Sequence, residues 1–317
     1  MRFKGIYTPI ITPFHPDFSI DWDAYAEVIE FQIEAGVAGI IVGGSTGEVY
    51  ALSKDERLEQ IAFARDRIAG RTLLMAGVND MRTSECLSIA VAARDAGVDA
   101  LLVAAPPYSL PDQEELAQQV LAIDRAASLP IMLYNYPGRT GVKMGEAFLV
   151  GVAACANVCA IKESSGDVSR YPMIYRQFPH IQLVVGADDR VLETFAWGSQ
   201  AWVSATANIF PLECRRFLEI CALGGDFERG RRIMAAMLPL MQLLEQGGKF
   251  IQCVKHGALL QGLRPGVPRP PMQPMTKELA REMDKIVRTT RTAVQAIVAE
   301  PAAAGTAAVE RSRAGAA

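Results

Sequence analysis

Short apolar runs alternate with amphipathic stretches along the first two thirds of the chain. The apolar runs cover residues 5–11, 39–43, 72–76, 100–104, 130–134, 158–162, 182–185 and 201–204. Between them, apolar side chains recur at helical spacing in residues 22–35, 54–68, 83–95, 113–126, 145–153, 168–177 and 189–197. Strands that are apolar on both faces are typical of a parallel sheet covered by helices. The pattern therefore predicts repeated strand–helix units.

Eight such units favour an α/β fold of the (β/α)8 TIM barrel type. A near-repeat supports a recurring unit, because residues 35–42 (AGVAGIIV) resemble residues 96–103 (AGVDALLV), each with a glycine that ends a helix before a strand. The alternative is an open doubly wound sheet. However, no predicted strand is followed by the Gly-x-Gly-x-x-Gly dinucleotide motif.

The pattern after residue 208 is helical, at about 211–222, 226–246, 249–261 and 276–298. A proline-rich connector at 264–274 separates the last two helices. The sequence therefore predicts three parts. Residues 1–208 form the barrel with the active site, residues 209–298 form a C-terminal helical domain, and the alanine-rich residues 299–317 form a disordered tail.

Composition excludes several classes of function. The net charge of −3, without a basic stripe, argues against a nucleic-acid partner. No apolar run could span a membrane, and the N-terminus lacks the pattern of a signal peptide. The six cysteines have no framework spacing, so we expect them to be core residues of a reduced, cytoplasmic protein. The three histidines lie far apart in the sequence, which argues against a metal site.

Lys162 is the residue that most clearly suggests chemistry. It ends the apolar run 157–162 and is followed by the polar residues 163–167 (ESSGD). Burial at such a position disfavours the ammonium form and lowers the pKa of the amine. A neutral amine is required to form a Schiff base with a carbonyl substrate. The alternative is a lysine at a strand end that reaches water or pairs with an acid.

Polar groups also follow other predicted strands. They are residues 43–48 (GGSTGE), 106–108 (PPY), 134–141 (YNYPGRTG), 186–188 (GAD) and 204–208 (SATAN). In a barrel of this type, the active site lies at the carboxyl ends of the strands. The convergence of these groups on one end of the barrel favours a catalytic role for Lys162.

Three of these groups have two interpretations each. Residues 43–48 form a plain turn, or their N–H groups bind a carboxylate or phosphate at a helix N-terminus. Tyr134 is a core tyrosine, or it transfers protons to and from a Schiff base one strand away. Arg139 is a solvated turn residue, or its planar guanidinium binds a substrate carboxylate. The residues alone leave these alternatives open.

Together, the motifs at 43–48, 134–141, 161–163 and 204–208 resemble those of the dihydrodipicolinate synthase / N-acetylneuraminate lyase family. The similarity extends over about residues 3–291. The resemblance implies a (β/α)8 barrel with a C-terminal helical domain, assembled as a homotetramer from two tight dimers. It further implies a Schiff base with pyruvate or a longer 2-oxo acid, and no requirement for a metal or cofactor.

The resemblance implies a role for each of eight residues. Lys162 would be the Schiff-base nucleophile and Tyr134 the general acid/base. Ser45 and Tyr108 would complete a hydroxyl relay, with Tyr108 reaching in from the neighbouring subunit. The substrate-binding residues would be Thr46, Gly47, Arg139 and Val203.

The resemblance defines the second substrate less closely. Arg139 favours the synthases, in which the matching arginine holds the carboxylate of aspartate semialdehyde, whereas Ser45 stands where synthases usually have threonine. The stretch that binds feedback lysine in many synthases differs at Val49, Tyr50, Lys54, Met81 and Pro107. We therefore expect no strong inhibition by free lysine.

The function implied is a lyase that joins pyruvate, bound as a Schiff base, to a small carboxylated aldehyde. One alternative is a catabolic aldolase, dehydratase or deaminase that acts on a longer 2-oxo acid. The other is a 2-oxo acid sensor without catalysis, which the intact set of Lys162, Tyr134 and Ser45 disfavours.

Overall fold

A closed barrel of eight parallel strands forms the centre of the molecule. The computed structural model describes residues 1–301, so the predicted tail from residue 302 onward lies outside the described residues. The strands are β1 (Gly5–Pro9), β2 (Gly39–Val42), β3 (Leu73–Gly77), β4 (Ala100–Ala104), β5 (Ile131–Asn135), β6 (Val158–Glu163), β7 (Gln182–Val185) and β8 (Ala201–Val203). Each strand pairs with the next along the chain, and β8 pairs with β1. The predicted (β/α)8 barrel is confirmed, and the open-sheet alternative is wrong because β8 closes onto β1.

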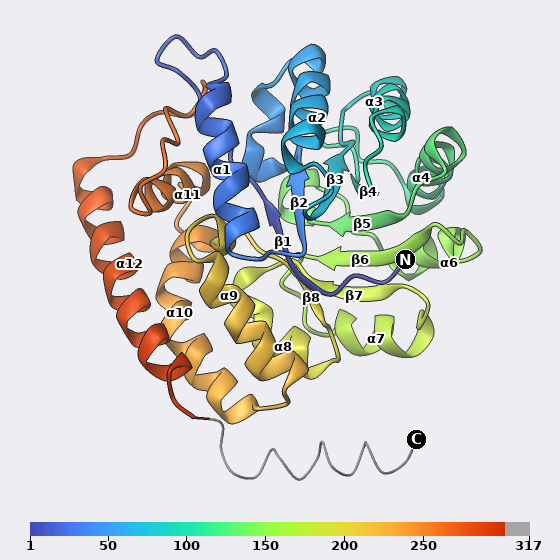
Figure 1. Ribbon diagram of the computed structural model, residues 1–317. Coiled ribbons are helices and arrows are strands. Elements are labelled where there is room, and N and C mark those ends of the chain that lie inside the picture. Colours follow the sequence, from blue (N-terminus) through green and yellow to red (C-terminus); the bar gives the residue numbers. More distant parts are fainter. Residues whose placement is uncertain (302–317) are drawn as a thin grey trace.

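Helices surround the barrel (Figure 1). Those that follow β1 to β7 are α1 (Trp22–Glu34), α2 (Lys54–Ile68), α3 (Thr83–Asp95), α4 (Gln113–Ala127), α6 (Glu146–Val152), α7 (Arg170–Gln177) and α8 (Val191–Ala196). A short helix, α5 (Pro137–Thr140), lies between β5 and α6. After β8, α9 (Pro211–Leu218) packs against β1 and completes the ring.

Side-chain caps fix where several of these helices begin. Asp21 caps α1, since its carboxylate accepts a hydrogen bond from an N–H of the first turn. Ser53 with Glu56, and Asp112 with Glu115, form capping boxes at the starts of α2 and α4. A cap of this kind contributes about 1 kcal/mol to stability. These polar residues therefore fix the first turns of the outer helices.

Two apolar layers hold the barrel together. The inner layer fills the barrel with side chains such as Tyr7, Met75 and Leu102. The larger outer layer lies between the strands and the helices. Tyr134 and Val203 belong to the inner layer. The carboxyl end of the barrel, where the predicted site lies, therefore rests directly on packed core.

The first strand is shorter than the predicted run of residues 5–11. It ends at Pro9, and the N–H of Ile11 donates to the side chain of Asn208 at 3.1 Å. This N–H is therefore not available to a neighbouring strand. The chain leaves the sheet at this point although it stays apolar.

The C-terminal helices stand beside the barrel, with α12 outermost (Figure 1). They are α10 (Phe227–Gln246), α11 (Phe250–Leu259) and α12 (Lys277–Val298). Both α10 and α11 contact η4 (Thr206–Asn208) after β8, and α10 also contacts η3 (Asp188–Arg190) after β7. These helices therefore reach the carboxyl end of the barrel. The division into domains at residue 208 stays a prediction.

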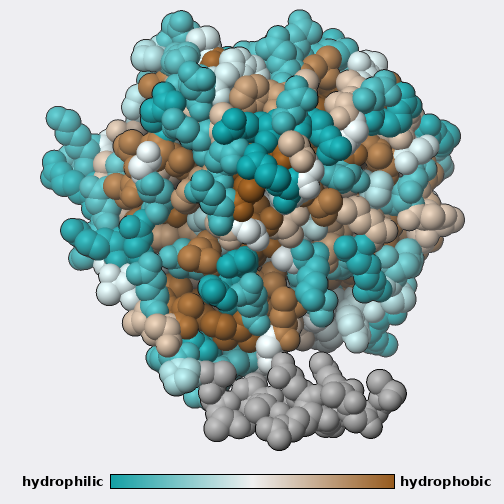
Figure 2. All heavy atoms as spheres, in the orientation of Figure 1, coloured by the Kyte–Doolittle hydropathy of each residue, from teal (hydrophilic) through white to brown (hydrophobic). Residues whose placement is uncertain are grey.

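Hydrophilic side chains cover much of the face in Figure 2, and hydrophobic ones show between them. Exposed ion pairs such as Arg264 with Glu27, at 2.7 Å, lie on the surface. Pairs of this kind add little to stability in water. No helix within residues 1–301 has both the length and the apolar character that crossing a bilayer requires.

Candidate active site

Lys162 is buried at the carboxyl end of β6. Its exposed fraction is 6%, and its neighbours in the sheet are Tyr134 of β5 and Val184 of β7. Its Nζ atom lies 3.9 Å from the centre of the Tyr134 ring. No ion pair within residues 1–301 includes Lys162. The amine is therefore enclosed by protein without a counter-ion of its own.

The environment of Lys162 favours the neutral amine. Burial lowers the pKa of Lys162 from 10.5 to about 8, although the carboxylates of Asp188 and Glu245 oppose the change. At pH 7, about one amine in ten is then neutral, and at pH 8 about half are. The neutral form is the one that attacks a carbonyl carbon.

A small chamber surrounds the amine. Its volume is about 20 Å³, which is room for about one water molecule. Six of the eight residues predicted from the sequence line it, namely Lys162, Tyr134, Ser45, Thr46, Arg139 and Val203. The barrel thus brings together side chains from strands that are far apart in the sequence.

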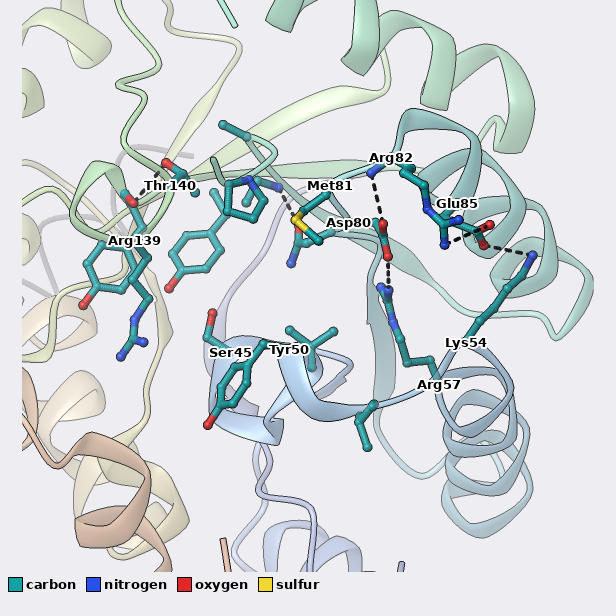
Figure 3. Close-up of a pocket in the computed structure, with 18 of the residues that line it drawn as sticks. Ser45, Tyr50, Lys54, Arg57, Asp80, Met81, Arg82, Glu85, Arg139 and Thr140 are labelled. Carbon is teal, nitrogen blue, oxygen red and sulfur yellow. Dashed lines mark hydrogen bonds and ion pairs between the residues drawn. The ribbon is translucent and has the colours of Figure 1, made fainter. Parts of the chain in front are cut away.

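The chamber joins a larger outer pocket of about 840 Å³, with which it shares Ser45, Tyr134, Tyr136 and Arg139 as lining residues. Figure 3 shows Ser45 and Tyr50 on one side of this pocket and Arg139 on the other. The outer pocket supplies the room that a substrate larger than water needs. The shared residues mark the place where the chamber and the outer pocket meet.

Tyr134 keeps its proton in this environment. It is 6% exposed, and burial raises the pKa of its hydroxyl strongly. Its ring packs against Tyr136, with 5.8 Å between the ring centres. A fixed, protonated hydroxyl beside a neutral amine is suited to donating a proton during imine formation.

Arg139 lies on α5, above the chamber. Its guanidinium carbon is 5.4 Å from the centre of the Tyr136 ring and 5.3 Å from that of Phe250. Contacts of a guanidinium with two aromatic rings hold its charge in place without neutralising it. Arg139 is exposed, so its hydrogen-bond donors remain available to an anion.

Ser45 and Thr46 lie in the turn η1 (Ser45–Gly47) that follows β2. The first N–H groups of a helical turn have no partner within the turn and are suited to an anion. Gly47 is the last residue of the turn and does not line the chamber. Its carbonyl accepts a hydrogen bond from the hydroxyl of Thr12 at 2.7 Å. A Cβ at Gly47 would lie 3.0 Å from the carbonyl oxygen of Ile10. Gly47 therefore permits the turn to sit close to β1.

Tyr108 does not enter the chamber of its own chain. It is 90% exposed and follows β4 in a left-handed backbone conformation, with a φ of 74°. A non-glycine residue in that conformation is strained by about 1 kcal/mol or more. The backbone thus projects an apolar ring into solvent instead of packing it.

A second buried lysine holds the turn η1 against the C-terminal helices. Lys255 of α11 is 2.6 Å from Glu48, and both side chains are almost fully buried. The amine also donates to the carbonyl of Val267 at 2.7 Å. Burial lowers the pKa of Lys255 to about 8, and Glu48 opposes the change. Unlike Lys162, it has a carboxylate partner and does not line the chamber.

Sequence reasoning missed five residues of the chamber lining, which are Tyr136, Gly186, Ala205, Glu245 and Phe250. Tyr136, Gly186 and Ala205 lie in strand-end groups that the sequence singles out, so a signal for them existed. Glu245 and Phe250 belong to the C-terminal helices, where they occupy ordinary helical positions. Within residues 1–301, His, Cys, Asp and Glu side chains form no group arranged to hold a metal ion.

Comparisons with known proteins agree on one family. The family model described as "Dihydrodipicolinate synthetase family" matches residues 2–290. The 4-hydroxy-tetrahydrodipicolinate synthase of Caldicellulosiruptor bescii is 34% identical over 280 residues, which are 87% of this chain and 93% of that protein. The synthase of Methanocaldococcus jannaschii is 34% identical over 293 residues, which are 90% and 98% of the two chains.

Solved structures show the same similarity. The 4-hydroxy-tetrahydrodipicolinate synthase of Methylacidiphilum fumariolicum SolV matches with a TM-score of 0.87 and 29% identity, over 93% of this chain and 98% of that chain. A prophage protein from E. coli K12 belonging to the dihydrodipicolinic acid synthase family, solved in complex with pyruvate, matches with a TM-score of 0.86 and 25% identity. That match covers 92% of this chain and 99% of the other.

Proposed function

The chain belongs to the dihydrodipicolinate synthetase family and is a lyase, and we propose that it binds pyruvate as a Schiff base on Lys162 and condenses it with a carboxylated aldehyde. The observation that carries this proposal is the buried, unpaired amine of Lys162 in a chamber beside Tyr134. The reaction is of the type named for its synthase relatives.

The first half of the proposed reaction uses Lys162 and Tyr134. The neutral amine attacks the keto carbon of pyruvate, and Tyr134 donates the proton with which the hydroxyl leaves as water. The N–H groups and the hydroxyl of the turn at Ser45 and Thr46 hold the pyruvate carboxylate. Loss of a methyl proton then gives an enamine whose carbon can attack an aldehyde. Ser45 of the same chain, together with Tyr108 of the partner subunit, carries protons between Tyr134 and solvent.

Arg139 would hold the carboxylate of the aldehyde. Its guanidinium is fixed between two aromatic rings at the mouth of the chamber, and its planar fork suits a carboxylate. Val203, which is buried in the chamber wall, would pack beside the bound 2-oxo acid. We further propose a cytoplasmic homotetramer, a dimer of dimers, in which Tyr108 completes the neighbouring site.

A second candidate is a catabolic aldolase or dehydratase acting on a longer 2-oxo acid. It is favoured by Glu245, because an acidic group in the chamber suits a substrate that carries hydroxyl groups. Both candidates share the imine at Lys162. A sensor without catalysis is disfavoured, because Lys162, Tyr134 and Ser45 all line one chamber.

Reduction of the imine tests the proposal. Treatment with pyruvate and borohydride should attach one reduced pyruvate per chain, and peptide mass spectrometry should locate it on Lys162. Lys255 is the internal control, since burial lowers its pKa to a similar value but it lies outside the chamber. The Lys162→Arg variant should not be labelled, because a guanidinium stays protonated. Labelling at Lys255 instead, or none with any 2-oxo acid tested, would contradict the proposal.

A further inference from the structure

Glu245 enters the chamber from the C-terminal helices. It lies in the last turn of α10 and lines the chamber together with Lys162 and Tyr134. Its neighbour Gln246 donates to Asp189 of η3 at 2.9 Å, which fixes the end of α10 on the turn after β7. Tyr134 belongs to β5, on the opposite side of β6. The chamber around the amine of Lys162 is therefore lined both by a tyrosine of the barrel and by a glutamate of the C-terminal helices.

The carboxyl group of Glu245 makes few contacts that would stabilise the fold. Its one hydrogen bond within residues 1–301 is the acceptance at Oε1 of the Asp188 N–H, at a long 3.4 Å. No ion pair in that part of the chain includes it. Glu245 is half-buried. A partly desolvated carboxyl group without an ion-pair partner, in a chamber beside a reactive amine, is typical of functional sites.

Burial and the neighbouring charges bring the pKa of Glu245 close to neutral pH. Burial raises the pKa of Glu245 from 4.5 to about 7, with Asp188 and Asp189 of η3 adding to the rise and Lys162 opposing it. The other ionisable groups in the chamber lining are Tyr134, Tyr136 and Arg139. Both protonation states of Glu245 are therefore populated near neutral pH, as an efficient general acid/base requires.

We propose that Glu245 is a second catalytic acid/base, which exchanges a proton with the oxygen on C4 of a 4-hydroxy-2-oxo acid bound as an imine to Lys162. This inference rests on the imine proposed above and deepens it. In the direction of condensation, C3 of the enamine bonds to the aldehyde carbon and the π electrons of the aldehyde move onto its oxygen. That oxygen takes the proton of Glu245 and becomes the C4 hydroxyl.

The proton count closes without another reagent. Tyr134, deprotonated after it protonates the leaving hydroxyl, takes the methyl proton of the imine and is protonated again. Hydrolysis of the protonated product imine to ketone and neutral amine releases the proton that restores Glu245. In the direction of cleavage, the Glu245 carboxylate removes the proton from the C4 hydroxyl as the C3–C4 bond breaks. The site then releases pyruvate and an aldehyde. A 4-hydroxy-2-oxo acid is the substrate class that this arrangement fits.

The Glu245→Gln variant separates this role from imine formation. Glutamine keeps the size of the side chain and a hydrogen-bond acceptor but cannot exchange the proton. Glu228→Gln is the matched control, because Glu228 lies exposed in the first turn of the same helix. Three measurements are needed. They are borohydride trapping of pyruvate, exchange of the pyruvate methyl protons in D₂O by NMR, and cleavage of 4-hydroxy-2-oxoglutarate and 4-hydroxy-2-oxopentanoate.

Trapping and exchange should be retained in Glu245→Gln, since neither involves a C4 oxygen. Its kcat for cleavage should fall by about 10²- to 10⁴-fold, the usual contribution of a general acid or base. The ionisation near pH 7 should disappear from the kcat profile, and Glu245→Asp should recover part of the activity. Glu228→Gln should behave as wild type in all three measurements.

Each contrary result has its own meaning. Normal cleavage by Glu245→Gln would reduce Glu245 to a lining residue, and an equal loss of trapping, exchange and cleavage would make it only a support for Lys162. Wild-type enzyme that exchanges pyruvate protons but cleaves neither probe would overturn the substrate class. Wild-type enzyme that neither traps nor exchanges pyruvate would instead contradict the imine itself.

Discussion

Replacing Lys162 by methionine should abolish activity but make the protein more stable. The folded state holds an unpaired ammonium in a buried position, whereas in the unfolded chain the same group is in water. Methionine has a similar length and packs well in irregular apolar spaces. The substitution therefore removes a destabilising charge without creating a large cavity.

The magnitude follows from the pKa of Lys162, which burial lowers from 10.5 to about 8. At about 1.4 kcal/mol per pKa unit, the folded state is destabilised by about 3 kcal/mol when the pH is below the folded-state pKa. Between about pH 8 and pH 10.5, the unfolded state binds the proton and the folded state does not, so stability rises with pH. The advantage of Lys162→Met should thus shrink from about 3 kcal/mol at pH 7 to about 1 kcal/mol at pH 10.

Urea unfolding followed by tryptophan fluorescence, at pH 7 and pH 10 and at equal protein concentration, measures this difference. Lys255→Met is the matched control, because burial lowers the pKa of Lys255 to about 8 as well. Lys255 pairs with the fully buried Glu48, and its loss should destabilise the protein by about 3–5 kcal/mol. The reasoning is refuted if Lys162→Met is no more stable than wild type at pH 7, or if its advantage is the same at both pH values.

Three further predictions concern the substrates and the assembly. Arg139→Ala should lower kcat/KM for the aldehyde by an amount that corresponds to about 2–3 kcal/mol of lost transition-state stabilisation. This is the lower part of the range for a truncated charge pair, because the guanidinium is exposed before the substrate binds. Pyruvate trapping should not change, and unaltered kinetics would make Arg139 a surface residue. Free L-lysine should not inhibit at sub-millimolar concentration, because apolar or bulky side chains line the outer pocket at Val49, Tyr50, Met81 and Pro107. Steady-state assays with lysine check this directly. Mixing Lys162→Ala with Tyr108→Phe chains by unfolding and refolding should restore up to about half of a dimer's activity, because one of its two sites then carries both lesions and the other neither. If mass spectrometry confirms mixed dimers but activity stays absent, Tyr108 does not act across subunits.

The fold was predictable because its strands are buried on both faces. Runs such as residues 100–104 appear in the sequence as continuous apolar stretches, and β4 has the same bounds. The end of the first strand was not predictable, since the N–H of Ile11 donates to the side chain of Asn208, which lies 197 residues away in the sequence. Local pattern thus identifies elements, and distant polar contacts set their limits.

Some residues of the candidate site were likewise predictable from the sequence and others were not. Lys162 was predictable because a charged residue ends an apolar run, whereas the roles of Tyr134 and Arg139 were predictable only through the resemblance to the family. Glu245 was not, because a glutamate in the last turn of a helix is common on protein surfaces. Tertiary packing, including the contact of α10 with η3, brings that position to the chamber. The barrel strands can be assigned from local pattern, whereas the wall contributed by the C-terminal helices depends on tertiary packing.

The two buried lysines show what distinguishes a reactive amine from a structural one. Burial lowers the pKa of both Lys162 and Lys255 to about 8, so the pKa alone does not identify the nucleophile. Lys255 is neutralised by Glu48 at 2.6 Å and satisfied by a carbonyl, and it ties the turn at Ser45 to α11. Lys162 has no such partner within residues 1–301 and faces a chamber that continues into the outer pocket. A buried amine can act as a nucleophile where it has no counter-ion and where a carbonyl compound can reach it. The missing counter-ion lowers the stability of the folded protein, and the Lys162→Met variant measures this loss as a gain in the free energy of unfolding.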